Sequence, residues 1–151
     1  IKTINEKDLF AFFKEYVSKY KMPLNPSKEA ILLKSMNFLK NKAKTLEDIF
    51  DNAQYLINDD MKIGIEDKKL LDELAKNVIK DFVTEYEKIT TPSKENVEPL
   101  IKSLIGKHKT NFKGVGQPLR IALVGSKFGP GLYDVILSLD KSEVIKRLNK
   151  I

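Results

Sequence analysis

Cysteine is absent from this 151-residue sequence, and histidine occurs only once, at His108. Without cysteine the chain can form neither disulfides nor thiolate metal sites, which fits a reducing cytoplasm. With no cysteine and a single histidine, we expect neither a zinc site nor a Cys–His or Ser–His arrangement. His108 lies between Lys107 and Lys109, so we expect it to be solvated or to contact phosphate. We therefore predict no catalytic residue and no metal site.

Long apolar runs and nucleotide-binding motifs are also missing. The longest apolar runs are a few residues, which predicts no membrane-spanning helix and no secretory signal. Gly129-Pro-Gly131 is too short to replace a phosphate-binding or dinucleotide-binding glycine loop. Asp59-Asp60 is best explained as a solvated turn. We expect a cytoplasmic chain without a cofactor of its own. Because it begins at Ile1 rather than Met, we also expect it to be a piece of a longer protein.

Positive charge is concentrated in the second half of the chain. The net charge is +6, with 11 Lys against 10 acids in residues 1–66 and 16 Lys and Arg against 11 acids in 67–151. No acid lies between Pro99 and Tyr133, where the cations are Lys102, Lys107, Lys109, Lys113, Arg120 and Lys127. Such a surface favours an anionic partner that salt would weaken. A nucleic acid is preferred over a membrane.

Helical periodicity dominates, and no segment alternates as a strand would. With 42% hydrophobic and 32% charged residues, the composition is that of a globular domain. We predict an all-α fold of about eight helices in two adjoining bundles, one over residues 1–64 and one over 65–151. The boundary is placed at the polar, glycine-containing segment 58–64.

Local signals place the helix starts in the first bundle. Asn5 is a good N-cap, Asn25 precedes Pro26 at a first helical position, and Thr45 with Asp48 resembles a capping box. The first helix carries an apolar stripe at helical spacing, and the sequence predicts that it faces the core. Its members are Leu9, Phe12, Phe13, Tyr16, Val17 and Tyr20.

In the second bundle the clearest helix is predicted from about Asp67 to Lys88. Thr90-Thr-Pro-Ser93 then breaks and caps the chain before another helix, and residues 106–116 are interpreted as a basic connection. A short helix from Leu132 and a last one capped by Asp140 or Ser142 end the chain.

The most distinctive stretch is Gln117-Pro-Leu-Arg-Ile-Ala-Leu-Val-Gly-Ser-Lys-Phe-Gly-Pro-Gly-Leu-Tyr-Asp134. It predicts a helix with Pro118 at its first position and Gly125 as its stop. The glycines of the following loop let a ligand approach the backbone closely. A plain corner between two helices would explain the same residues, but the acid-free surroundings favour an anion-binding site.

These residues carry a family resemblance. Gln117-Pro-Leu-Arg-Ile-Ala-Leu-Val-Gly125, then Gly129-Pro-Gly-Leu-Tyr-Asp134, then Leu139-Asp-Lys-Ser-Glu-Val-Ile-Lys-Arg-Leu148 resemble the C-terminal anticodon-binding region of bacterial glutamyl-tRNA synthetases. The likeness extends over the whole chain, from Ile1-Lys-Thr-Ile-Asn-Glu-Lys-Asp-Leu9 through Lys44-Thr-Leu-Glu-Asp-Ile-Phe50. The chain departs from the family pattern at Val124, Gly116 and Asp140.

The resemblance implies that ATP and Mg²⁺ act in a class I catalytic domain that precedes this segment, since neither ATP-binding signature of that class is present. The segment would be a non-catalytic, monomeric module that grips the anticodon loop of tRNA(Glu). Loop bases are recognised by stacking and by hydrogen bonds along their edges. We expect base contacts from Arg120, Gly129, Pro130, Leu132 and Tyr133, and phosphate contacts from Lys113 and Lys127.

Lys42 stands, by the spacing to Lys44-Thr-Leu46, where some family members use an arginine to separate the glutamate from the glutamine anticodon. Without that planar fork, tolerance of tRNA(Gln) as well is expected. Two other hypotheses stay open on the sequence: a free-standing basic helical module that binds RNA or protein, and a helical scaffold with no RNA affinity.

Overall fold

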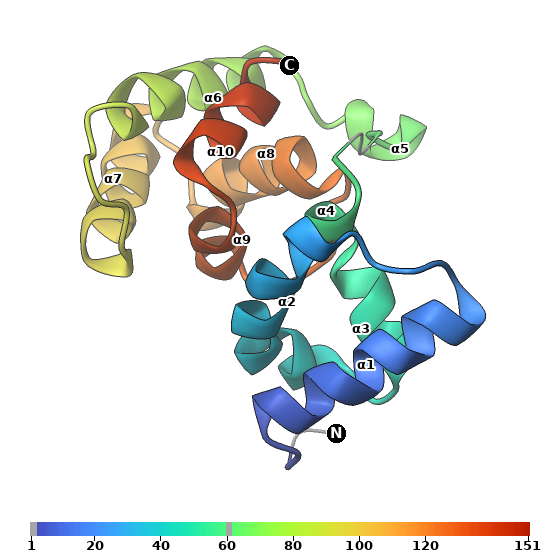
Figure 1. Cartoon of the computed structure of the whole chain (residues 1–151). Coiled ribbons are helices and arrows are strands. Elements are labelled where there is room, and N and C mark those ends of the chain that lie inside the picture. The colour runs from blue at the N-terminus through green and yellow to red at the C-terminus, as the bar shows by residue number, and fades with distance from the viewer. Residues whose placement is uncertain (1–2, 60–61) are drawn as a thin grey trace. The chain divides into compact units, whose positions relative to one another are not determined.

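The computed structural model describes residues 3–59 and 62–151, and helices are the only regular elements in that part of the chain (Figure 1). These residues form ten α-helices and one short 3₁₀ helix, which confirms the all-α prediction. The chain divides into two compact units, Ile1–Met61 and Lys62–Ile151, here called unit 1 and unit 2.

Unit 1 is built by helices that begin where the sequence predicted. Asn5 accepts the backbone N–H of Asp8, Asn25 accepts that of Ser27, and Thr45 forms a reciprocal capping box with Asp48. These caps satisfy N–H groups that have no partner inside a helix. The elements are α1 (Glu6–Tyr20), α2 (Pro26–Leu39), η1 (Lys40–Lys42), α3 (Leu46–Asn52) and α4 (Gln54–Ile57).

The apolar stripe of α1 separates into two rows, and one of them is not core. Leu9, Phe13 and Val17 are buried against α2 and α3. The parallel row differs: Tyr16 is half-buried, while Phe12 is 54% and Tyr20 64% exposed. The prediction that the whole stripe faces the core is therefore wrong for Phe12 and Tyr20. The apolar residues of α1 occupy a wider arc of the helix than the rest of unit 1 covers, so Phe12 and Tyr20 stay exposed.

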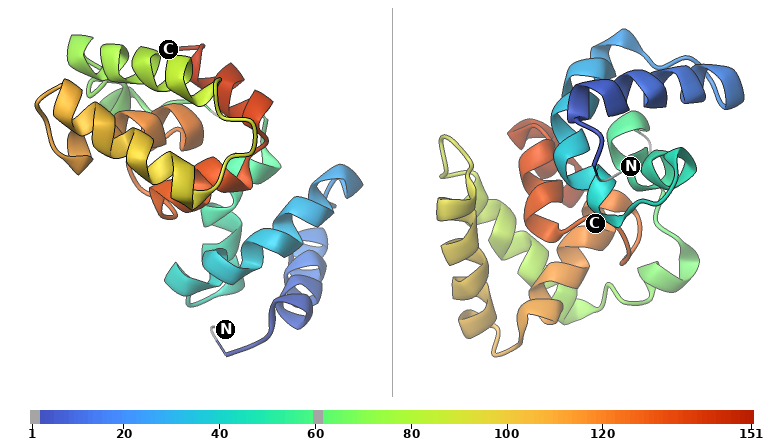
Figure 2. Two further views of the ribbon diagram at one scale, coloured as in Figure 1. Left: turned by 90° about the vertical axis from the view of Figure 1, so that its left-hand side faces the viewer. Right: turned by 90° about the horizontal axis from the view of Figure 1, so that it is seen from below.

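Unit 2 is organised around α8 (Phe112–Val124), which packs against four other helices (Figures 1 and 2). Its core side chains include Val115, Leu119, Ile121 and Leu123. Its neighbours are α6 (Glu73–Tyr86), α7 (Lys94–Lys107), α9 (Leu132–Ser138) and α10 (Lys141–Leu148), and the unit also contains the short α5 (Ile65–Lys68).

Two element bounds in unit 2 differ from the prediction. The helix expected from Asp67 to Lys88 is interrupted, because Asp72 caps a new helix start by accepting the N–H of Ala75. A capping aspartate competes with continuous helix in this way.

The predicted connection over residues 106–116 is also wrong. Gly106 belongs to α7, and Asn111 caps α8 by accepting the N–H of Gly114, so Gly116 and Pro118 lie inside the helix. Packing on four helices outweighs the low helix propensity of glycine and proline.

Candidate nucleic-acid interface

The site is a loop between α8 and α9, residues 126–131, whose entry is fixed by a glycine. Gly125 has φ 84°, and its N–H donates to the carbonyl of Ile121 at 2.9 Å. This left-handed cap ends α8 and turns the chain outward. Gly129 has φ 146°, a region that side-chain-bearing residues rarely adopt. The loop therefore depends on glycine at two points.

Arg120 links the last turns of α8 to this loop. Its Nη1 donates to the carbonyl oxygen of Lys127 at 3.3 Å. The buried Nε finds no acceptor among the described residues, and burial lowers the pKa of the guanidinium from its ordinary value. A guanidinium carries five N–H donors. Arg120 thus has an N–H donor available for a ligand close to the point where α8 leads into the loop.

A second arginine, Arg147, holds the end of α8 from the side of α10. It is 5% exposed, and its Nη1 donates to the carbonyl of Leu123 at 2.7 Å. Its Nε donates to Glu143 at 2.8 Å, so the buried charge is paired. Arg147 satisfies a carbonyl that has no intrahelical partner and positions the turn from which the loop departs. No role was predicted for Arg147, although it lies in the Arg147-Leu148 end of the family motif.

Two aromatic side chains, one from α8 and one from α9, lie close together. The ring centroids of Phe112 and Tyr133 are 6.2 Å apart, and the ammonium of Lys94 lies 5.9 Å from the Tyr133 ring centroid. Burial, and then the nearby Glu98 carboxylate, raise the pKa of Tyr133 above its usual value. A Cβ on Gly116 would lie 3.3 Å from both Phe112 and Leu132. Glycine there lets these side chains approach the helix closely.

The predicted site residues of unit 2 differ in how far they are exposed. Arg120, Gly129 and Tyr133 lie at or near the loop with partly accessible surfaces, and Lys113 and Lys127 are exposed. Leu132 is 2% exposed and Pro130 is buried. The base contacts predicted for Leu132 and Pro130 therefore find no exposed side chain in this structure, because both side chains pack inward.

Lys42 lies in η1 of unit 1 and is exposed. One residue of the loop escaped prediction: Phe128 is 73% exposed. The signal for it was an aromatic residue between a lysine and a glycine in an otherwise small-residue loop.

His108 is not solvated as predicted. Its side chain is 13% exposed, and its Nε2 lies 2.8 Å from Oδ2 of Asp81, a carboxylate that also pairs with Lys107 at 3.0 Å. Lys107, and then His108, hold the pKa of Asp81 below its usual value. Asp81 on α6 thus neutralises part of the positive charge that the sequence placed on this stretch.

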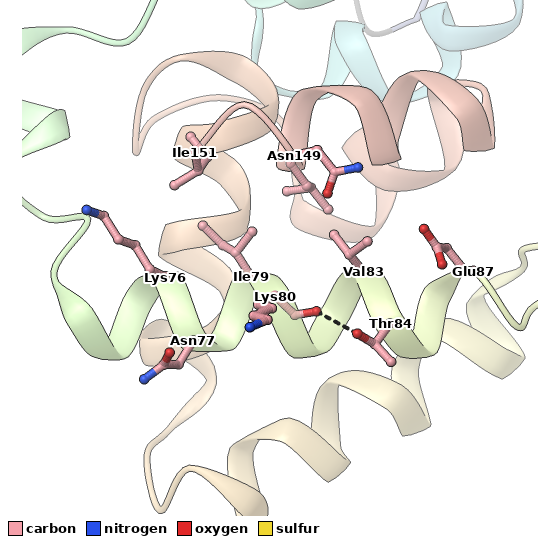
Figure 3. A pocket seen from close by; sticks show the side chains of 10 residues that line it. Lys76, Asn77, Ile79, Lys80, Val83, Thr84, Glu87, Asn149 and Ile151 are labelled. Carbon is pink, nitrogen blue, oxygen red and sulfur yellow. Dashed lines mark hydrogen bonds between the residues drawn. The ribbon is translucent and has the colours of Figure 1, made fainter.

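The described residues contain no group of three or more acidic or histidine side chains that could hold a metal ion. None of the described helices is long and apolar enough to cross a membrane. A groove between α6 and the end of the chain shares no residue with the loop site (Figure 3). Ile79, Val83, Leu148 and Ile151 are its apolar lining residues, and the charged ones are two lysines and one glutamate.

The chain matches known sequences over almost its full length. A family model described as an anticodon binding domain matches residues 5–151. Glutamate–tRNA ligase of Pelagibacter ubique (strain HTCC1062) is 56% identical over 152 residues, covering 100% of this chain and 33% of that protein. Glutamate–tRNA ligase of Nitrobacter hamburgensis is 31% identical over 146 residues, covering 94% of this chain and 31% of that protein. The chain thus spans about a third of the length of these relatives.

Solved structures share the fold. A crystal structure of a glutamate tRNA ligase from Elizabethkingia meningosepticum has a TM-score of 0.78 at 20% identity, covering 97% of this chain and 29% of that one. Glutamate-tRNA synthetase from Elizabethkingia anophelis has a TM-score of 0.74 at 19% identity, covering 99% and 28%. Together these findings confirm the resemblance to glutamyl-tRNA synthetases, and the chain belongs to the family of anticodon binding domains.

Proposed function

We propose that this chain reads the anticodon loop of tRNA(Glu) as the anticodon-binding part of a glutamate–tRNA ligase. The ATP-dependent glutamylation, with its ATP and Mg²⁺, would take place in a catalytic domain outside this chain. Support comes from the 56% identity to a glutamate–tRNA ligase over the whole chain. We further propose that the module acts as a monomer in the cytoplasm.

The observation that carries the proposal is the state of Arg120. Its guanidinium is partly buried, donates to the Lys127 carbonyl where α8 leads into the loop, and keeps a buried Nε–H without an acceptor among the described residues. A planar fork of donors suits the edge of a base or a phosphate. In a partly water-excluded position, such hydrogen bonds separate right from wrong partners strongly, since a mismatch leaves groups unpaired.

The surrounding residues complete the interface. Tyr133, already paired with Phe112, offers part of its ring, and Gly129 has no side chain that would keep a ligand away from its backbone. The exposed Lys113 and Lys127 would contact phosphates, which position the RNA without reading its sequence.

Binding of this chain to an anticodon stem-loop tests the proposal. We expect the tRNA(Glu) stem-loop to bind more tightly than a version with the central anticodon base changed, by roughly 5- to 150-fold for one lost set of base contacts. Arg120→Ala should abolish this preference. Arg120→Lys keeps the charge without the fork, and should retain overall affinity better than preference. Equal binding of both RNAs by the wild type, vanishing with salt, would leave only a generic basic surface.

Lys42 supports a finer proposal about specificity. It is exposed at the end of η1 in unit 1 and lacks the planar donors of an arginine, so the ligase would accept tRNA(Gln) as well as tRNA(Glu). Glutamylation assays of the full-length ligase with both tRNAs test this. Complete failure to charge tRNA(Gln) would refute it.

A further inference from the structure

Phe128 is a large apolar side chain that the fold leaves in water. It is 73% exposed, the most exposed phenylalanine among the described residues. Within the described part of the chain, the Phe128 ring has one ring contact, with the ammonium of the neighbouring Lys127, which lies 5.3 Å from the ring centroid. The folded chain therefore gains little from this ring, and burial in a core does not explain its presence.

The backbone beneath this ring is nevertheless held firmly. The carbonyl of the Lys127–Phe128 peptide group accepts from Arg120 at 3.3 Å, and its N–H donates to Oγ of Ser126 at 3.1 Å. Both polar atoms of that peptide group are thus fixed by side chains. Gly129 at φ 146° and the buried Pro130 follow at once, and Gly125 fixes the other end. The ring is presented outward by a loop that is ordered at both ends.

An exposed aromatic ring on a hydrogen-bonded backbone, with the Lys127 ammonium beside it, suits a particular ligand. Bases that are splayed out of an RNA loop stack on aromatic side chains, and stacking tolerates any base because each has a π-face. Lys127 supplies positive charge for the adjoining phosphates. A protein partner would need a larger apolar patch, whereas Phe128 is flanked by Lys127 and Gly129.

We propose that Phe128 is a stacking platform for one unpaired base of the anticodon loop, and that Arg120 and Ser126 pre-organise it. This inference rests on the proposed function and deepens it. It assigns different tasks to two residues of the site: Arg120 in α8 reads base identity, while Phe128 in the loop adds affinity that does not depend on sequence.

Affinity measurements on Phe128 variants test the platform. Phe128→Leu keeps apolar bulk without the π-face and should weaken binding of the tRNA(Glu) stem-loop by about 5-fold, the lower end of what loss of a stacked ring costs. The same factor should apply to the stem-loop with the changed central base, so the ratio of the two affinities stays constant. Phe128→Tyr should bind like the wild type. Thermal unfolding should not change, because the ring is exposed.

Fluorescence gives a second readout. The sequence has no tryptophan, so Phe128→Trp places a single tryptophan at the platform, and base stacking should quench its emission when RNA is added. Phe12→Trp, at a 54% exposed phenylalanine of unit 1, is the matched control and should not be quenched.

The outcomes separate the two proposals. If the wild type distinguishes the RNAs but Phe128→Leu binds as tightly as the wild type, the platform is wrong and the proposed function stands. If Phe12→Leu loses as much affinity as Phe128→Leu, or if bound RNA leaves the emission of the Phe128→Trp variant unchanged, the platform is again wrong. If the wild type binds no RNA, both proposals fail.

Discussion

At the scale of single residues, the Asp81 carboxylate ties α6 to the end of α7. It accepts from Lys107 and His108, and these partners lower its pKa. A lowered pKa in the folded state means that the stabilisation is fully present above the unfolded value near 4 and is lost as pH falls through the lower folded value.

Asp81→Asn should therefore destabilise the protein at pH 7 and matter progressively less below about pH 4. The side chain of Asp81 is 29% exposed, so we expect a loss of about 1 kcal/mol at pH 7. Urea unfolding of both proteins at pH 7 and pH 3 measures the difference. An equal loss at both pH values would show that the amide disturbs packing instead of removing a charge interaction.

At the scale of elements, two glycines should respond to alanine with opposite signs. Gly125 ends α8 at φ 84°, where a Cβ costs about 1–2 kcal/mol. Gly106 lies inside α7, and nothing would lie within 4 Å of a Cβ there. Gly125→Ala should lower the free energy of unfolding by about that amount, and Gly106→Ala should raise it by roughly 0.4–1 kcal/mol.

Chemical unfolding of both variants measures these changes, and Gly125→Ala should in addition weaken RNA binding, because the loop leaves α8 at this cap. Stabilisation by Gly125→Ala would mean that the left-handed turn is not needed for the loop.

The elements also show what sequence can predict. Helix starts at Asn5, Asn25 and Thr45 were predictable because a cap is a contact within four residues. The interruption before Asp72 was not predictable, because the helical periodicity of apolar residues continues through it. The early start of α8 was not predictable either, because tertiary packing overrides the low helix propensity of glycine and proline there. Local sequence signals identify helix caps. The bounds of a helix depend in addition on whether local propensity or tertiary packing contributes more to its stability.

The same limit applies to the candidate site. The sequence placed Arg120 and the glycine loop, since motif and charge pattern are both local. It could not show that Leu132 and Pro130 turn inward, that His108 meets Asp81 from another helix, or that Arg147 reaches back over 24 residues to Leu123. These facts depend on how helices far apart in the chain pack together.

At the scale of the whole molecule, charge divides unevenly between the two units. Residues 1–61 hold 10 lysines against 9 acids, whereas 62–151 hold 17 lysines and arginines against 12 acids. The net positive charge therefore lies mainly in unit 2, which also carries the 126–131 loop. Neutralising phosphates releases counterions, so each phosphate contact adds about 0.7–0.9 to the slope of log affinity against log salt.

The double variant Lys113→Gln, Lys127→Gln should make this slope shallower by about 1.4–1.8, if each lysine contacts one phosphate. The preference for the tRNA(Glu) stem-loop over the changed base should persist, because phosphate contacts carry no sequence information. Titrations at several salt concentrations measure both quantities. Lys14→Gln in unit 1, where Lys14 pairs with Glu29, is the control and should leave the slope unchanged. An equal change in slope for the control would mean that net charge, rather than Lys113 and Lys127 in particular, attracts the RNA.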